Sequence, residues 1–171
     1  AMCGGVRRAR VSSQAWKRAT RRRFAEELDE ADLGVRTKHV VEMVANKIRE
    51  DATIDDESAT ALALAVVQAA GLKVVKPRKG EGQDTEFLVL VSYRQAAALA
   101  ELAAETYAAS GELAAAVKAL GESDAKRSAK AVLGQGNSVD LALFGRMVAN
   151  DTDLNVDASC QVAHAISVHA A

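Results

Sequence analysis

The sequence predicts an α+β fold that is mostly helical. Between residues 37 and 133, apolar residues recur at the three- and four-residue spacing of amphipathic helices, and only short runs are rich in β-forming residues. Apolar residues make up 49% of the 171 residues but aromatic residues only 4%, so Ala, Val and Leu must fill the core. This composition favours closely packed helices, and the length suits one ordinary domain.

The N-terminal segment predicts a turn, a strand and a helix in that order. Gly4 and Gly5 allow the backbone to turn, and residues 6–11 can form a short strand. Ser12 or Ser13 can then cap a helix that begins near Gln14.

Two helices and a strand are expected next. Residues 37–49 and 55–70 carry apolar side chains at helical spacing, and Gly71 ends the second helix. Residues 73–84 include Pro77, Gly80 and Gly82 among charged residues, which predicts an exposed turn before a buried strand at 86–91.

The remaining elements are mainly helical. Ser92 with Gln95 three residues later is a capping-box pattern, so we expect an alanine-rich helix from there to about residue 109, with shorter helices at 112–120 and 123–133. A turn at residues 134–137 precedes an alternating run at 139–144, which predicts a strand. A final helix is expected from Asn155 or Asp157 to His169.

Charge is distributed unevenly although the net charge is only -1. Residues 7–23 include no acidic residue and contain the basic residues Arg7, Arg8, Arg10, Lys17, Arg18, Arg21, Arg22 and Arg23. Acidic residues then dominate positions 26–32. Any argument for a polyanionic partner therefore rests on this local clustering and not on the overall charge.

The basic segment predicts a phosphate-binding surface. Gln14, Lys17, Arg18 and Arg21 stand at i, i+3, i+4 and i+7, so they share one face of the expected helix. Cations in such a stripe neutralise phosphates, and the free N–H groups of the helix start, with the hydroxyls of Ser12 and Ser13, can hydrogen-bond phosphate oxygens. Binding of this kind depends on salt and hardly on sequence. Taken alone, the pattern more often indicates a solvated helix that pairs with the acidic run.

Three motifs resemble those of one family. They are AMCGGVRRARVSSQAWKRATRR at residues 1–22, SVDLALFGRMVAND at 138–151 and VDASCQVAHAISVH at 156–169. In order and spacing they resemble motifs of the CasC-type backbone subunit of the type I-E CRISPR Cascade complex, whose members are roughly twice as long. The chain does not begin with Met, and we expect it to be a truncated part of a longer protein that lacks the first palm strand, the thumb and the later segments.

The resemblance implies an RRM-like (ferredoxin-like) palm, present in part, with a large helical insertion called the fingers. The division would be a basic palm segment at 1–36, fingers at 37–134, and a palm strand and helix at 135–171. It also implies a non-catalytic subunit that binds CRISPR RNA and polymerises along it, together with other Cascade subunits, in an antiviral complex that meets target DNA through guide pairing. Its RNA-binding residues would be Arg7, Arg8, Arg10, Ser12, Ser13, Gln14, Lys17, Arg18, Arg21, Arg146 and Met147.

Other functions have weaker support. A helix-turn-helix DNA reader could use residues 14–23 as its recognition helix, although no well-placed helix precedes them. A nuclease would need clustered carboxylates, and Asp84 and Asp140 are isolated in the sequence. Cys160, His164 and His169 lie close together, but zinc needs three or four convergent ligands, so we expect a packed helix with hydrogen-bonded histidines and neither metal nor cofactor.

The compartment is expected to be the cytoplasm. Cys3 and Cys160 occur without a secretory signal, as is typical of reduced thiols. No apolar run approaches the length that spans a bilayer, so we expect no membrane association.

Overall fold

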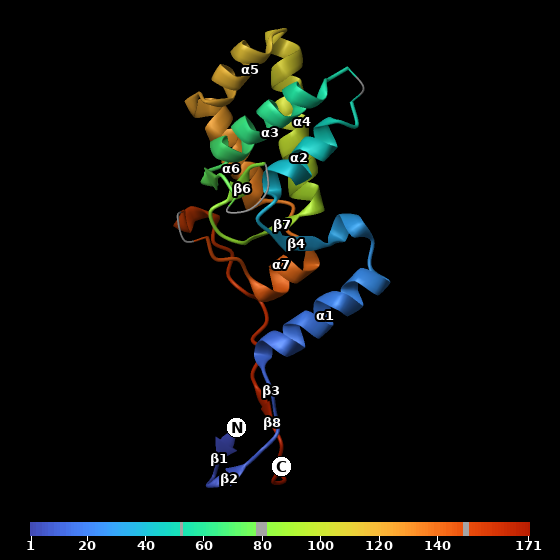
Figure 1. The fold of residues 1–171 in the computed structure, drawn as a ribbon, viewed down its shortest axis with the longest axis vertical. Helices are drawn as coiled ribbons and strands as arrows, with labels where there is room; N and C mark the ends of the chain where they lie inside the picture. Colours follow the sequence, from blue (N-terminus) through green and yellow to red (C-terminus); the bar gives the residue numbers. More distant parts are fainter. Residues whose placement is uncertain (52, 78–81, 149–150) are drawn as a thin grey trace.

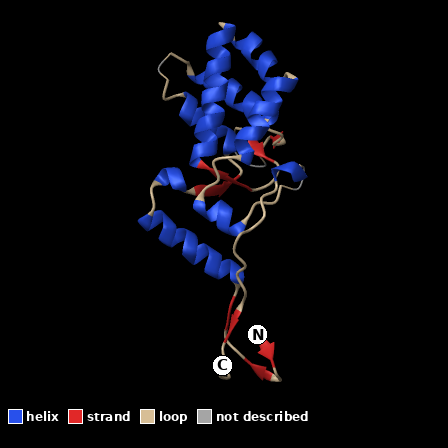
Figure 2. Cartoon of the chain, turned by 180° about the vertical axis from the view of Figure 1, so that it is seen from behind, coloured by secondary structure: helices blue, strands red, loops and turns tan. Residues whose placement is uncertain are grey.

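The protein has a helical body, a small sheet beneath it and a long thin arm. The structure is a computed structural model, and it describes residues 1–51, 53–77, 82–148 and 151–171. The arm leads away from the body, and both chain termini lie at its far end (Figure 1). Helix α1 crosses the space between arm and body, and Figure 2 shows the same arrangement from behind. The predicted mostly helical α+β fold is confirmed.

The arm consists of two short antiparallel pairs. Strand β1 (Met2–Cys3) pairs with β2 (Val6–Arg7) around Gly4 and Gly5, whose φ angles of 62° and 77° explain why glycine occupies both positions. Strand β3 (Arg10–Val11) pairs with β8 (Ala165–Ile166). The single strand predicted at residues 6–11 is thus divided into two.

The helix predicted from Asn155 or Asp157 to His169 is wrong. The 3-10 helix η2 (Thr152–Leu154) ends before it, and the chain then runs extended to β8. The backbone N–H groups of Ser167 and Ala171 donate to the carbonyls of Ala9 and Arg7, so this segment satisfies its polar groups against the N-terminal arm. The β-branched residues Val162, Ile166 and Val168 favour that extended pairing.

The helical body packs small and branched aliphatic side chains. It contains α2 (Val40–Ile48), α3 (Asp56–Ala69), α4 (Tyr93–Ser110), α5 (Leu113–Leu120) and α6 (Ser123–Gly134). Its fully buried side chains are mostly Val, Leu and Ala, as the composition predicts. The pair β5 (Val74–Val75) and β6 (Asp84–Thr85) borders the body, whereas Gly80 of the predicted turn lies outside the described residues.

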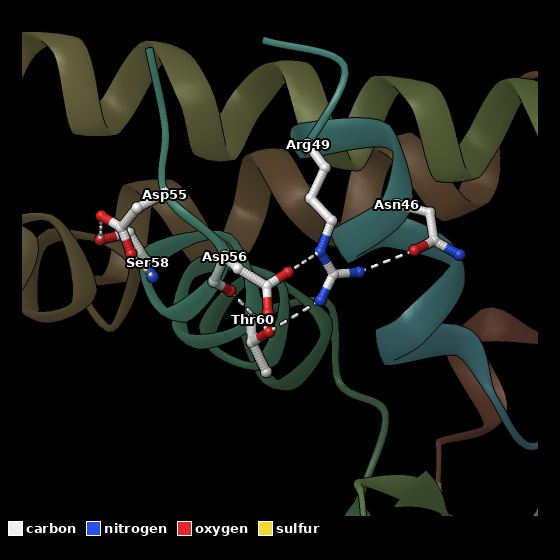
Figure 3. Close-up of polar contacts among 6 residues, drawn as sticks. All are labelled: Asn46, Arg49, Asp55, Asp56, Ser58 and Thr60. Atoms are coloured by element: carbon white, nitrogen blue, oxygen red, sulfur yellow. Dashed lines mark hydrogen bonds and ion pairs between the residues drawn. The ribbon is translucent and has the colours of Figure 1, made fainter. Parts of the chain in front are cut away.

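The corner between α2 and α3 is held by polar side chains (Figure 3). Asp55 caps α3 by accepting the Ser58 N–H at 2.9 Å and the Ser58 hydroxyl at 2.7 Å. Arg49, which follows α2, donates to Asp56, to Asn46 at 2.7 Å and to Thr60 at 3.1 Å. These bonds fix the angle at which the two helices meet.

The sheet beneath the body pairs β4 (Gly34–Thr37) with β7 (Val89–Ser92), and the 3-10 helix η1 (Glu30–Asp32) leads into it. The predicted capping box is confirmed, because the Ser92 side chain accepts the Gln95 N–H while the Gln95 side chain accepts the Ser92 N–H. Strand β7 therefore passes directly into α4, which ties the sheet rigidly to the helical body.

The strand predicted at residues 139–144 is wrong, since α7 (Val139–Phe144) is a helix. Six residues are too few to separate the two periods, and Ser138 at the N-cap with Asp140 in the first turn favours the helix. Gly145, with φ at 73°, ends it, and Arg146 then pairs with Val156 in an isolated bridge. Ala149 and Asn150 of the motif at 138–151 lie outside the described residues.

No described helix is both long enough and apolar enough to cross a membrane.

Candidate nucleic-acid interface

Helix α1 (Ser13–Glu27) carries the basic stripe and buries none of its residues. Ser12 caps it by accepting the Ala15 N–H at 3.1 Å. The Ser13 N–H donates to Nδ1 of His164, in the extended segment, at 3.1 Å. The helix start that we expected to offer free N–H groups to phosphate is thus partly occupied by the protein's own acceptors.

Two cations of the stripe attach α1 to α7. The Lys17 ammonium and the Arg21 guanidinium lie 5.4 Å and 4.9 Å from the centre of the Phe144 ring, within the range of cation–π attraction. Arg21 Nε also donates to Asp140 Oδ2 at 3.0 Å, and only 3% of the Asp140 side chain is exposed. Arg21 is therefore an anchor for the helix as well as a charge on its surface.

Beyond this attachment, α1 and the sheet enclose a groove of about 670 Å³. Its lining includes most of the predicted RNA-binding residues that lie outside the arm. They are Gln14, Lys17, Arg18, Arg21, Arg146 and Met147, joined by Arg22, Ala25, Arg36, Leu88, Leu90 and Gly145. The motif near the N-terminus and the Gly-Arg-Met segment therefore meet at one place, although more than a hundred residues separate them.

Arg18, Arg22 and Arg36 are the cations that the groove offers most freely. All three residues are exposed, and none of their side chains has a hydrogen-bond or ion-pair partner among the described residues. Sequence reasoning did not select Arg22, although it stands one turn after Arg18 on the same face. No sequence pattern predicts Arg36 as a site residue, because the pairing of β4 with β7 brings it to the groove.

Arg146 is buried, unlike the other cations that line the groove. The residue is 5% exposed, and its guanidinium donates to the carbonyls of Leu154 at 2.8 Å and Leu133 at 2.6 Å. Burial lowers the pKa of this guanidinium. Its charge is directed at the interior and not at a ligand, whereas the neighbouring Met147 is 82% exposed beside the groove.

The three arginines of the arm lie away from the groove's lining. Arg7 and Arg10 are exposed. Arg8 donates to the carbonyls of Cys3, Ser167 and Val168, so it joins the two sides of the arm. A role of Arg7 and Arg10 in RNA binding stays a prediction.

Comparison with known proteins identifies the family. Residues 1–171 match the sequence profile of the CT1975-like proteins, the family designated Cas_CT1975. The chain belongs to this family.

Two solved structures resemble this CT1975-like chain. A chain of a CRISPR RNA-guided surveillance complex has a TM-score of 0.76 and 30% identity over 99% of this chain and 51% of its own length. A chain of a CRISPR RNA-guided surveillance complex in a pre-nicking state has a TM-score of 0.78 and 31% identity over 99% of this chain and 46% of its own. The CT1975-like chain thus spans about half the length of these relatives, and no curated protein matches it.

The geometry of the CT1975-like chain also bears on the other candidate functions. Asp84 Oδ1 lies 2.8 Å from His39 Nδ1, and Asp140 is held by Arg21 and Ser138, so these carboxylates do not converge. Across the described residues, no group of three or more His, Cys, Asp or Glu side chains could hold a metal ion. Residues 1–12 form strands and turns, so the segment directly before α1 is not the helix that a helix-turn-helix places there.

Proposed function

We propose that this chain is a non-catalytic, CRISPR RNA-binding backbone subunit of CasC type in a type I-E Cascade complex. The observation that carries the proposal is the groove between α1 and the sheet, which the unpaired cations Arg18 and Arg22 line on the α1 side and Arg36 lines on the sheet side. Membership of the CT1975-like family and the similarity to chains of CRISPR RNA-guided surveillance complexes support it.

The mechanism is electrostatic positioning of the guide. Cations that neutralise phosphates release counterions, which stabilises the complex independently of base sequence. A guide of any sequence can therefore be held by the same residues, with its bases available for pairing to target DNA. Lys17 and Arg21 add positive electrostatic potential to the groove and also attach α1 to α7.

The assembly implied by the resemblance extends this role. Copies of the chain would pack head to tail along the guide in the cytoplasm, with other Cascade subunits completing the complex. Residues 1–36 and 135–171 would form part of an RRM-like palm, and residues 37–134 the fingers. Helix α1 and the N-terminal strands of the arm would belong to the first division and β8 to the last, and the groove would lie where palm and fingers meet.

A salt titration tests the proposal. Binding of a fluorescent single-stranded RNA would be measured for the native chain and for its Arg18→Ala/Arg22→Ala variant. Each phosphate contact contributes about 0.7 to the slope of log affinity against log salt for a single strand, so the double variant should lower the slope by roughly 1.4 for every RNA sequence. Arg127→Ala is the matched control, because this α6 side chain is 81% exposed and lies outside the groove, where it pairs with Asp124.

Three results would contradict the proposal. An unchanged slope in the double variant would remove α1 from the interface. Tighter binding to duplex DNA of equal length would favour a DNA reader. Cleavage of the RNA on addition of Mg²⁺ would contradict the absence of catalysis.

A further inference from the structure

The groove has two walls of different chemistry. Helix α1 forms a cationic wall, and the sheet forms the other, which includes apolar side chains. In β7 and the residue before it, side chains alternate between the two faces of the sheet. Val89 and Val91 are 4% and 0% exposed and belong to the core of the helical body. Leu88 and Leu90 belong to the opposite face and line the groove, as does Arg36, which is paired with Leu90 across the two strands.

Part of this sheet face is covered and part is open. Gly34, on the same face as Arg36, lies against α7, because a Cβ at Gly34 would be 2.6 Å from Ser138 Oγ and 3.1 Å from Asp140 Oδ1. Leu90 is 6% exposed, whereas Leu88 is 46% exposed. Helix α1 lies across the groove from this open part, and none of its residues is buried. The Leu88 side chain is therefore left in solvent on the opposite side of the groove from the cations of α1.

We infer that Leu88 and Arg36 form a base-contacting wall, so that a single strand lies in the groove with its phosphates toward α1 and its bases against the sheet. The inference rests on the proposed function and specifies how the strand is oriented. Proteins that hold single strands without sequence preference combine a positive groove with a surface for the bases. The planar guanidinium of an arginine can stack on a base, and every base has an apolar face that an aliphatic side chain can cover.

The backbone that carries the wall is fixed before any ligand binds. The register of β4 with β7 places Arg36 opposite Leu90. The Thr85 hydroxyl donates to the Phe87 carbonyl at 2.8 Å, which fixes the turn that leads to Leu88. Arg146 Nη1 lies 3.4 Å from the Leu90 carbonyl, so the buried guanidinium also supports this strand. A preformed surface loses little entropy on binding.

The test compares an ordinary single-stranded RNA with an abasic oligonucleotide of equal length, for the native chain and for Leu88→Ala. If Leu88 covers a base, the variant should bind the ordinary RNA roughly tenfold more weakly, with an unchanged salt slope, and should bind the abasic strand as the native chain does. Leu88→Phe should bind the ordinary RNA at least as tightly as the native chain. Val117→Ala on α5, where the native side chain is 37% exposed, is the control.

Arg36 is tested by its conservative substitution. A stacked guanidinium is not replaced by an ammonium, so Arg36→Lys should lose affinity for the ordinary RNA although it keeps the positive charge. Full rescue by Lys, with a lower salt slope in Arg36→Ala, would make Arg36 a phosphate contact and overturn its place in the wall.

The other outcomes separate this inference from the proposed function. Equal losses on ordinary and abasic strands, or no loss with Leu88→Ala, would overturn the base-contacting wall while the result for Arg18 and Arg22 still stood. If Leu88→Ala instead abolished self-association in analytical ultracentrifugation without RNA, the face would be a protein interface. An unchanged salt slope in the Arg18→Ala/Arg22→Ala variant would contradict the proposed function itself.

Discussion

The ion pair between Arg21 and Asp140 gives a quantitative prediction about how α1 is attached. Removing Arg21 leaves a carboxylate with 3% of its side chain exposed, to which, among the described residues, the Ser138 hydroxyl 2.7 Å away is the remaining side-chain donor. Breaking a fully buried ion pair costs about 3–5 kcal/mol, but the Arg21 side chain is 33% exposed, so we expect Arg21→Ala to cost about 2 kcal/mol. Asp140→Asn keeps an acceptor in place and should cost about 1 kcal/mol.

A double-mutant cycle isolates the pair. The combined variant should be less destabilised than the sum of the two single variants, with a coupling of roughly 1 kcal/mol. Unfolding in urea would be followed by far-ultraviolet circular dichroism and by fluorescence of Trp16, the single tryptophan, which lies on α1. In Arg21→Ala the fluorescence transition should precede the dichroism transition, because α1 is released before the body unfolds.

The reasoning would be refuted if Arg21→Ala unfolded within 0.5 kcal/mol of the native chain, which is about the scatter expected for surface substitutions. It would also fail if the two substitutions were additive. In the first case the contact of Lys17 with Phe144 would suffice to hold α1, and in the second Arg21 would act through Phe144 and not through the carboxylate.

Two further predictions concern a close approach beside the groove and a helix cap in the helical body. Gly34→Ala should destabilise the chain by about 1–3 kcal/mol in a thermal melt, because the new methyl group would lie 2.6 Å from Ser138 Oγ and push α7 away from the sheet; a melt like that of the native chain would contradict this close approach. The Ser58 hydroxyl and N–H hold the pKa of Asp55 below its usual value of 3.8 (Figure 3). Since the folded pKa is the lower one, this contribution to stability is present above the unfolded pKa and is lost as pH falls through the folded pKa. The urea midpoint of Asp55→Asn should therefore fall less than that of the native chain below about pH 4, and an equal fall in both chains would contradict the assignment.

Local signals in the sequence predicted the local structure well. The capping box at Ser92 and Gln95, the cap at Ser12 and the glycine turn at Gly4 and Gly5 each depend on residues within four positions of one another. Such patterns are satisfied within a few residues, by the backbone and a neighbouring side chain, so they depend little on tertiary contacts. The cationic face of α1 belongs to the same class, and its residues do line one groove.

Failures occurred mainly where distant contacts decide the outcome. The segment predicted as a helix ending at His169 is extended because it pairs with the N-terminal arm. The α7 prediction failed for a local reason, since six residues are too few to separate the two periods. Arg146 illustrates the limit set by distant contacts for the site. Its motif indicates a cation near the guide, but the carbonyls that surround it come from Leu133 and Leu154, which no local pattern brings to it.

The arm has a consequence for the order of folding. Arg8 and Ser167, which it brings into contact, are 159 residues apart in the sequence. The entropic cost of closing a chain loop grows with its length. In the arm this cost is offset by few hydrogen bonds and by little burial, because most of the arm's side chains are exposed. The helices of the body contact one another over shorter sequence separations, so the body should fold first. The pairing of the arm should form last. In the folded protein the same pairing should be the first to open, which makes the arm the least protected of the backbone ladders.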